Sequence, residues 1–488
     1  MDRSVIIGGA GPAGLTAAYE LARHGIRPVV LEAGGQVGGL ARTEEYKGYR
    51  FDIGGHRFYT KAPGVQRIWE ELLGDEFLRR PRLSRIYFNH RFFQYPLSVS
   101  NVVRNLGVVE ALRILASYAK ARLVPLAPEE TFEQWVVNRF GRRLYGTFFK
   151  TYTEKVWGIP CTEIRAEWAA QRIKDLSLVA AVVQALFGTR NIRSLIEEFY
   201  YPRLGPGQMW ERCRDCVEEL GGQVLLETPV RALRRSGERI TAVKVGRDEE
   251  VRELPVDHFI SSLPLTQLIR SLDPPPPAGV LEAARSLKYR DFILVALIIH
   301  RPHLFPDNWI YVHSAESRVG RIQNFKNWSP DMVPDPARTC LGMEYFCTRG
   351  DDLWKMEDAD LVMLATREIS QLGLARAADV EDGCVIRQPA AYPVYDGEYR
   401  RHLDVLRDFL TGFENLQTVG RNGMHRYNNQ DHSMLCGLYA AQNLMGARHD
   451  LWDVNTERSY YEEQQIESRE TRIDPAPRPL ESQPVQTT

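Results

Sequence analysis

The 488-residue sequence has little excess of charge and few cysteines. Its 62 basic and 63 acidic residues leave a net charge of −1, so no global field favours nucleic acid as a partner. The seven cysteines are odd in number and widely spaced, which excludes a disulfide framework and is typical of a reducing compartment. We therefore expect a cytoplasmic protein that does not bind nucleic acid.

Long hydrophobic runs and metal-ligand clusters are also missing. The longest apolar stretch, residues 176–187 (LSLVAAVVQALF), is shorter than the ~18 residues that cross a bilayer. We predict a buried helix there and no transmembrane span. Cys213 and Cys216 form a single CxxC without a second ligand pair at zinc spacing, so we expect no metal site.

The first 32 residues follow the pattern of a nucleotide-binding βαβ unit. A β-branched strand at 4–7 leads into a glycine-rich turn at 8–14, then a helical pattern and a second strand that ends at Glu32. The glycines permit a tight turn, close approach to a pyrophosphate and close helix packing, while the acid can accept hydrogen bonds from ribose. The residues that we expect to bind a dinucleotide are Gly9, Gly11, Pro12, Ala13, Gly14 and Glu32.

A second glycine pair after the acid favours FAD over NAD, because it gives backbone room beside the pyrophosphate. Residues 33–43 (AGGQVGGLART) and 51–56 (FDIGGH) resemble the GG doublet and the D-x-G-x-H stretch of a flavoprotein superfamily. That superfamily includes amine oxidases, protoporphyrinogen oxidase and UDP-galactopyranose mutase. The arginine usual after the pair is Leu40 here, and Arg42 could supply the phosphate contact. The resemblance implies FAD contacts from Ala33, Gly38, Gly39, Leu40, Ala41, Arg42, Gly54, Gly55 and His56.

The resemblance also implies an α/β fold with a Rossmann-like FAD-binding domain of the glutathione-reductase type. This domain would be discontinuous, comprising residues 1–60, 200–270 and 411–465. A helical substrate lobe (61–199) and a sheet-based substrate domain (271–410) would be inserted into it, and residues 466–488 would form a disordered tail. Further FAD contacts are implied for Val230, Ser262, Gly420, Arg421, Asn429, Gln430, Asp431 and Ser433.

Residues 148–158 (FFKTYTEKVWG) resemble the YTEK-x-WG segment of UDP-galactopyranose mutases. Tyr152 and Trp157 could stack on a base or sugar ring, or pack in the core. The mutases carry an arginine downstream of this segment, and Arg172 lies near that position. Arg421 and Tyr427 match residues near the flavin and the substrate diphosphate, which an arginine fork can hold.

Three functions remain open. The first is an FAD-dependent oxidoreductase acting on a sugar-nucleotide or glycoside through flavin N5, with His56, Arg421 and Tyr427 as the catalytic candidates. The second is a mutase that interconverts pyranose and furanose forms with reduced FAD and no net redox change. The third is a flavin-binding protein without turnover. The expected partner is a small-molecule substrate, with NAD(P)H as a candidate electron donor; the oligomeric state is not predicted.

Overall fold

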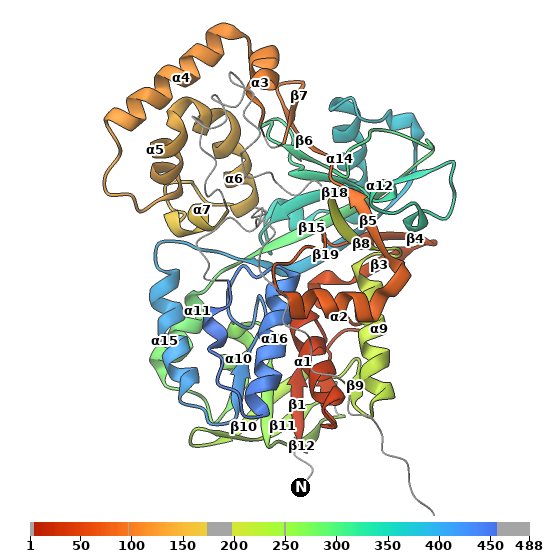
Figure 1. Cartoon of the computed structure of the whole chain (residues 1–488), viewed down its shortest axis with the longest axis vertical. Coiled ribbons are helices and arrows are strands. Elements are labelled where there is room, and N and C mark those ends of the chain that lie inside the picture. The colour runs from red at the N-terminus through yellow and green to blue at the C-terminus, as the bar shows by residue number, and fades with distance from the viewer. Residues whose placement is uncertain (1–3, 96, 173–197, 248–249, 456–488) are drawn as a thin grey trace, which may run out of the picture.

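The chain folds around a five-stranded parallel sheet and a seven-stranded sheet that is mainly antiparallel (Figure 1). The computed structural model describes residues 4–95, 97–172, 198–247 and 250–455. The apolar stretch 176–187 and the tail 466–488 lie outside these ranges. Within them, no helix has the length and apolar character needed to cross a bilayer.

A five-stranded parallel sheet takes its strands from three separated parts of the chain. Its order is β20-β13-β1-β2-β9, with β1 Val5–Gly8, β2 Val29–Leu31, β9 Gln223–Leu225, β13 His258–Ser261 and β20 Leu416–Thr418. Both faces are buried, since Val5 and Ile7 pack in one core and Ile6 in another. This explains why the strand is continuously apolar. The predicted α/β fold is confirmed, whereas the exact domain boundaries stay a prediction.

Helices cover both faces of the parallel sheet. One face carries α1 Pro12–Arg23, α2 Pro63–Leu73, α9 Pro206–Glu219 and α16 Gln430–Leu444. The other carries α10 Leu265–Arg270, α11 Ala278–Ser286 and α15 Tyr399–Thr411, with a small sheet of β10 Val230–Ser236, β11 Arg239–Val245, β12 Arg252–Pro255 and β14 Leu272–Asp273. Cys213 is buried within α9, which agrees with a structural role for the CxxC.

A seven-stranded sheet forms the second half of the molecule. Its order is β19-β15-β18-β17-β16-β6-β7, with β6 Ser84–Phe88, β7 Arg91–Gln94, β15 Tyr289–Ile299, β16 Trp309–Val312, β17 Arg321–Asn324, β18 Thr339–Cys347 and β19 Val380–Pro393. Along β15, Ile293 and Val295 face one core while Phe292 and Leu294 face another, as the period of two requires. The core that contains Ile293 and Val295 is covered by α14 Asp358–Gln371. Two further helices of this half, α12 Phe325–Trp328 and α13 Asp352–Lys355, have a single turn each.

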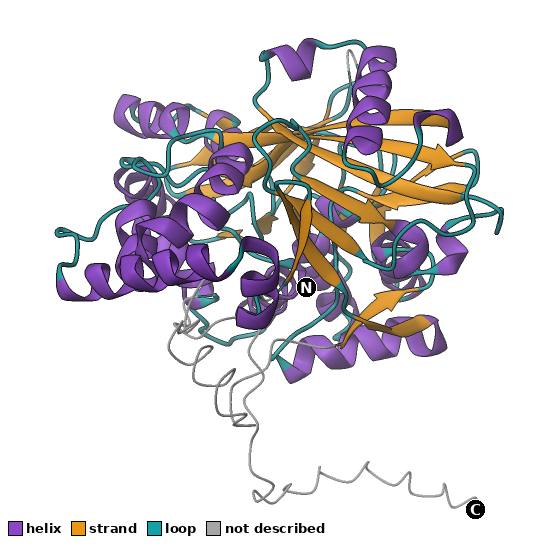
Figure 2. Cartoon of the chain, turned by 90° about the horizontal axis from the view of Figure 1, so that it is seen from above, coloured by secondary structure: helices purple, strands orange, loops and turns teal. Residues whose placement is uncertain are grey.

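Two two-stranded sheets and a helical lobe complete the described structure. The strand pairs are β3 Thr43–Tyr46 with β4 Tyr49–Asp52, and β5 Phe77–Pro81 with β8 Glu198–Pro202. The lobe comprises α3 Val99–Leu106, α4 Val108–Leu123, α5 Phe132–Leu144, a π-helix at Tyr145–Phe149, α6 Lys150–Trp157 and α7 Ala166–Arg172. Figure 2 shows these helices gathered to one side of the strands.

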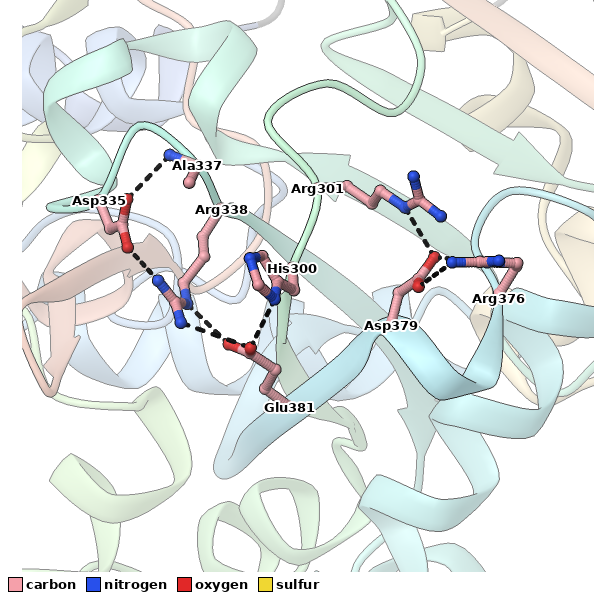
Figure 3. Close-up of polar contacts among 8 residues, drawn as sticks. All are labelled: His300, Arg301, Asp335, Ala337, Arg338, Arg376, Asp379 and Glu381. Carbon is pink, nitrogen blue, oxygen red and sulfur yellow. Dashed lines mark hydrogen bonds and ion pairs between the residues drawn. The ribbon is translucent and has the colours of Figure 1, made fainter.

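Ion pairs join the ends of three strands of the long sheet (Figure 3). Asp379, before β19, accepts hydrogen bonds from Arg301, after β15, at 2.8 Å and from Arg376 at 2.5 Å. Glu381 accepts from Arg338, which precedes β18, at 2.7 Å. Hydrogen bonds from the two arginines lower the pKa of Asp379. Asp379 is 11% exposed, but its arginine partners are 44% and 70% exposed, so these surface ion pairs align the strand ends and add little to stability.

Helix α16 packs on α1 through a glycine. A Cβ at Gly437 would lie 2.2 Å from the carbonyl oxygen of Ala13 and 3.1 Å from the backbone nitrogen of Ala17. Distances this short can be relieved only if the two helices move apart. Glycine at this helical position is therefore required by the contact, even though it costs helix propensity.

Gly437→Ala is expected to lower the stability by about 2 kcal/mol, since overpacking outweighs the gain of ~1 kcal/mol in helix propensity. Gly279→Ala in α11 is the matched control, because its Cβ would meet nothing within 4 Å. Melting temperatures of the two variants test this. A melting temperature for Gly437→Ala at or above that of the unsubstituted protein would contradict the packing argument.

Candidate active site

The glycine turn after β1 shapes the first part of the site. Gly9 has φ of +96°, and a Cβ at Gly14 would lie 1.9 Å from the Gly9 carbonyl oxygen. Glu32, at the end of β2, accepts hydrogen bonds from the backbone N–H groups of Ala10 at 2.8 Å and Gly34 at 2.9 Å. The acid thus lies beside the turn, where it can also reach ribose hydroxyls.

Helix α1 begins without a side-chain cap. Gly11 is its N-cap residue, Pro12 occupies the first turn, and that turn contains no acidic residue. Free N–H groups and the positive end of the helix dipole therefore point toward whatever lies beyond Gly11. This arrangement suits the pyrophosphate of a dinucleotide.

The second glycine pair lies directly against this turn. Gly38 donates its N–H to the Ala10 carbonyl oxygen at 2.8 Å, and Gly38 and Gly39 both have positive φ. A Cβ at Gly39 would lie 3.1 Å from the Cα of Gly11, and one at Gly11 would lie 3.7 Å from the Cα of Gly39. The two glycine turns therefore form a cradle that side chains would fill.

Arg42 links this cradle to the seven-stranded sheet. Leu40 and the buried Ala41 lie in the short 3₁₀ turn between the glycine pair and Arg42. The Arg42 guanidinium donates to Glu44 at 2.7 Å, to the Gly39 carbonyl at 3.0 Å and to Gln388 of β19 at 2.8 Å. These bonds hold the arginine next to the glycine pair, and its contact with a phosphate stays a prediction.

Ser262, Val230 and Ala33 are three further residues expected to contact FAD. Ser262 follows β13, and its hydroxyl donates to the Gly8 carbonyl oxygen at 2.8 Å. Val230 is buried at the start of β10, and the exposed Ala33 accepts a hydrogen bond from Arg247 through its carbonyl. Their contacts with FAD stay predictions.

The start of α16 forms the opposite end of the site. Asn429 caps this helix, and a Cβ at Gly420 would lie 3.0 Å from the Cβ of Ala13 in α1. Ser433 is buried in the first turn. Among the described residues, Oδ1 of Asp431 and Nε2 of Gln430 are buried without a hydrogen-bond partner. Buried polar atoms of this kind require partners, and a ribityl chain could supply them.

His56 lies between this end and the seven-stranded sheet. A Cβ at Gly54 would lie 3.5 Å from Nη2 of Arg321, while Gly55 is in contact with Trp328. Burial and the charges of Arg421 and Arg321 lower the pKa of His56 to about 3. The neutral ring donates from Nδ1 to the Gly54 carbonyl at 3.1 Å, which leaves Nε2 as an acceptor.

Arg421 and two tyrosines form the centre of the site. The guanidinium of Arg421 lies 4.7 Å from the ring centre of Tyr427 and 5.5 Å from that of Tyr392. It donates to the carbonyl oxygens of Asn428 at 2.9 Å and Ala391 at 3.3 Å. The two tyrosine rings stack at 5.7 Å, and burial raises the pKa of Tyr392 to about 12. Both cation–π contacts orient the guanidinium.

Strands β16 and β17 add residues that the sequence motifs missed. Arg321 donates to the fully buried Glu344 at 2.6 Å, so its charge is compensated. Tyr152 of α6 stacks on His313 at 4.6 Å and meets Tyr311 edge-on at 5.5 Å. Neither Arg321 nor Tyr392 belongs to a glycine-rich or aromatic motif. Their strands, RIQN and VEDGCVIRQPAAYP, contain several polar residues, so no local pattern singles out these two side chains.

The substrate contacts expected of Trp157 and Arg172 stay predictions. Trp157 is 3% exposed and packs against Trp168, Tyr392 and Tyr427, so it supports the tyrosines from the core. Arg172 ends α7, and its side chain lies outside the described part of the structure.

Comparison with known proteins agrees with this geometry. The family model described as flavin containing amine oxidoreductase matches residues 12–420. Coproporphyrinogen III oxidase of Mycobacterium leprae is 25% identical over 441 residues, covering 84% of this chain and 91% of the relative. A probable UDP-galactopyranose mutase of Klebsiella pneumoniae is 23% identical over 176 residues, covering 34% of this chain and 44% of the relative.

Solved structures share the fold. Reduced UDP-galactopyranose mutase has a TM-score of 0.81 at 19% identity, covering 94% of this chain and 97% of that one. A putative protoporphyrinogen oxidase from Exiguobacterium sp. 255-15 has a TM-score of 0.68 at 17% identity, covering 91% and 99%. The glycine cradle, the uncapped start of α1 and the unpartnered atoms of Gln430 and Asp431 all fit a bound FAD. The chain belongs to the flavin-containing amine oxidoreductase family, and its cofactor is FAD.

Proposed function

We propose that the protein is an FAD-dependent oxidoreductase whose substrate is a sugar linked to a diphosphate, such as a sugar-nucleotide. The observation that carries this proposal is the charge of Arg421. Its contacts among the described residues are two carbonyl oxygens and two aromatic rings, and none is a carboxylate. A half-buried guanidinium without a counterion favours an anionic ligand, and its fork matches a diphosphate.

The surrounding residues suit the rest of such a substrate. Tyr152, Tyr392 and Tyr427 offer aromatic faces to a base or sugar ring. A phenol is protonated at neutral pH even at its ordinary pKa, and burial raises the pKa of Tyr392 further, to about 12. His56 remains neutral because burial lowers its pKa to about 3, and its Nε2 can accept a hydrogen bond. FAD, when bound, supplies the hydride chemistry, and these side chains bind and orient the substrate.

A mutase that interconverts sugar ring forms is the second candidate. The similarity of the whole chain to reduced UDP-galactopyranose mutase favours it at the level of fold. The same arginine and tyrosines would serve it, because both reactions need a diphosphate-linked sugar held in the site.

The reaction is tested by anaerobic mixing of the FAD-loaded protein with UDP- and dTDP-sugars. Loss of the flavin absorbance with a sugar-nucleotide alone is the expected result. Sugar isomerisation that occurs only after dithionite or NAD(P)H has reduced the flavin would replace this proposal with the mutase. Coproporphyrinogen and putrescine belong in the panel, because related proteins carry those substrates in their names. Bleaching by either one, and not by sugars, would refute the proposal.

Gly11→Val is expected to lower FAD retention at least tenfold. The valine side chain would occupy the space between the two glycine turns, where the backbone of Gly39 lies 3.7 Å from the added Cβ. Gly35→Val is the matched control, since its Cβ would meet only the Glu227 carboxylate at 4.0 Å. The ratio of flavin to protein absorbance measures the effect. Equal FAD content in the two variants would refute the role of the cradle.

Arg421→Ala is expected to raise KM for the sugar-nucleotide by about 10- to 100-fold, which corresponds to the ~1.5–3 kcal/mol of a charge-assisted hydrogen bond. Arg421→Lys should recover part of the loss, since it keeps the charge without the fork. Arg401→Ala is the control, because Arg401 is 80% exposed and pairs with Glu398 on the surface. If Arg421→Ala leaves both KM and FAD content unchanged, Arg421 holds neither ligand.

A further inference from the structure

Helix α4 lies at the outer edge of the helical lobe (Figure 1), and several of its apolar side chains are exposed to solvent. Of the large apolar side chains that are exposed in the described residues, nearly half lie on this helix or directly after it. They are Val108 (63% exposed), Val109 (65%), Leu112 (59%), Leu115 (41%), Leu123 (82%) and Val124 (69%). Elsewhere on the surface such residues are scattered singly, which is ordinary for a globular protein.

The spacing places most of these residues on one side of the helix. Val108, Leu112 and Leu115 follow the i, i+4, i+7 pattern of a single face, and Leu123 continues it two turns later. The opposite side carries the buried Ile114 and Ala121, which face α5. Folding of the lobe therefore requires only the inner side of α4, and the apolar outer side is left without a partner in the described structure.

The charges beside this face are mainly positive. Between residues 98 and 126 the chain carries Arg104, Arg113, Lys120 and Arg122 against one acid, Glu110. Glu110 is already bound to Arg143 of α5 at 2.5 Å and to Arg113 at 3.5 Å. Lys120 and Arg122 form no ion pair with any described residue and lie on the two borders of the apolar face. This local excess contrasts with the net charge of −1 for the whole chain.

We propose that α4 binds the surface of an anionic lipid bilayer. The helix would lie in the plane of the interface, with Leu112, Leu115 and Leu123 among the upper acyl carbons and Lys120 and Arg122 at the lipid headgroups. The described residues contain no helix able to span a bilayer, so the attachment is to the surface. The proposal is independent of the reaction proposed above.

The charge pattern favours a bilayer over a second copy of the chain. Parallel pairing of two α4 helices would place Lys120 and Arg122 of one copy near those of the other, and antiparallel pairing would place them at the start of the other copy's helix, where Glu110 lies. The single carboxylate of the segment, Glu110, is already occupied by arginines and cannot compensate them. An anionic lipid surface satisfies both the apolar row and the charges at its borders.

Flotation of the full-length, FAD-loaded protein with vesicles tests this proposal. The probes are phosphatidylcholine vesicles with and without about one third phosphatidylglycerol. Binding to the anionic vesicles should exceed binding to the neutral ones at least tenfold, because each basic residue near an anionic surface adds several-fold to the affinity. The excess should fall as salt shortens the Debye length from about 10 Å at 0.1 M to about 3 Å at 1 M.

Two double variants separate the contributions of the face. Leu112→Glu with Leu115→Glu should abolish flotation, and Lys120→Glu with Arg122→Glu should lower it at least tenfold on anionic vesicles. Met363→Glu is the control, because Met363 is 62% exposed on α14, away from the lobe, and should bind like the unsubstituted protein. Flavin absorbance and circular dichroism verify that each variant is folded.

Three results would overturn the proposal. The first is that the protein does not float with anionic vesicles. The second is that the double variant Leu112→Glu with Leu115→Glu floats as well as the unsubstituted protein. The third is a dimer on gel filtration that the same variant converts to a monomer, because a second copy would then occupy the face. A failure of the sugar-nucleotide assay leaves the vesicle result unaffected, since the two experiments measure different properties.

Discussion

Close backbone packing around the start of helix α1 is the constraint on which the rest of the structure depends. Gly14 lets the helix approach the turn after β1, and Gly437 lets α16 approach the same helix from the other side. Because side chains are absent at both contacts, the starts of α1 and α16 come together at one end of the parallel sheet. The proposed cofactor site lies there, and the loop that carries Arg421 and Tyr427 leads directly into α16.

The electrostatic design of the site follows from its position between the two sheets. Arg321 of the long sheet forms an ion pair with the buried Glu344, which compensates its charge. Arg421, on the other side of the site, has only carbonyl and aromatic partners among the described residues. His56, between them, is kept neutral by burial and by both positive charges. One uncompensated cation and a neutral imidazole therefore face the same space, an arrangement suited to an anionic substrate.

The features that the sequence predicts best are those set by the backbone conformation of a few neighbouring residues. The glycines at 9, 11 and 14 and the acid Glu32 are specified by a turn, a helix start and a strand end within one βαβ unit. The sequence does not predict the environment of Trp157, because its packing in the core depends on Trp168 and Tyr392 from other parts of the chain. Arg42 illustrates the same point, because its partner Gln388 lies 346 residues away.

The sequence by itself determined the α/β class, the FAD-binding turn and the second glycine pair, since these depend on residues that are neighbours in the chain. Only the tertiary structure decided which side chains share the site. It brought Tyr392 and Arg321 of the long sheet to His56 and Arg421, although none of the four is close to another in sequence. It likewise decided that one face of α4 is left exposed. Packing between distant elements sets such proximity and exposure, and local patterns do not encode it.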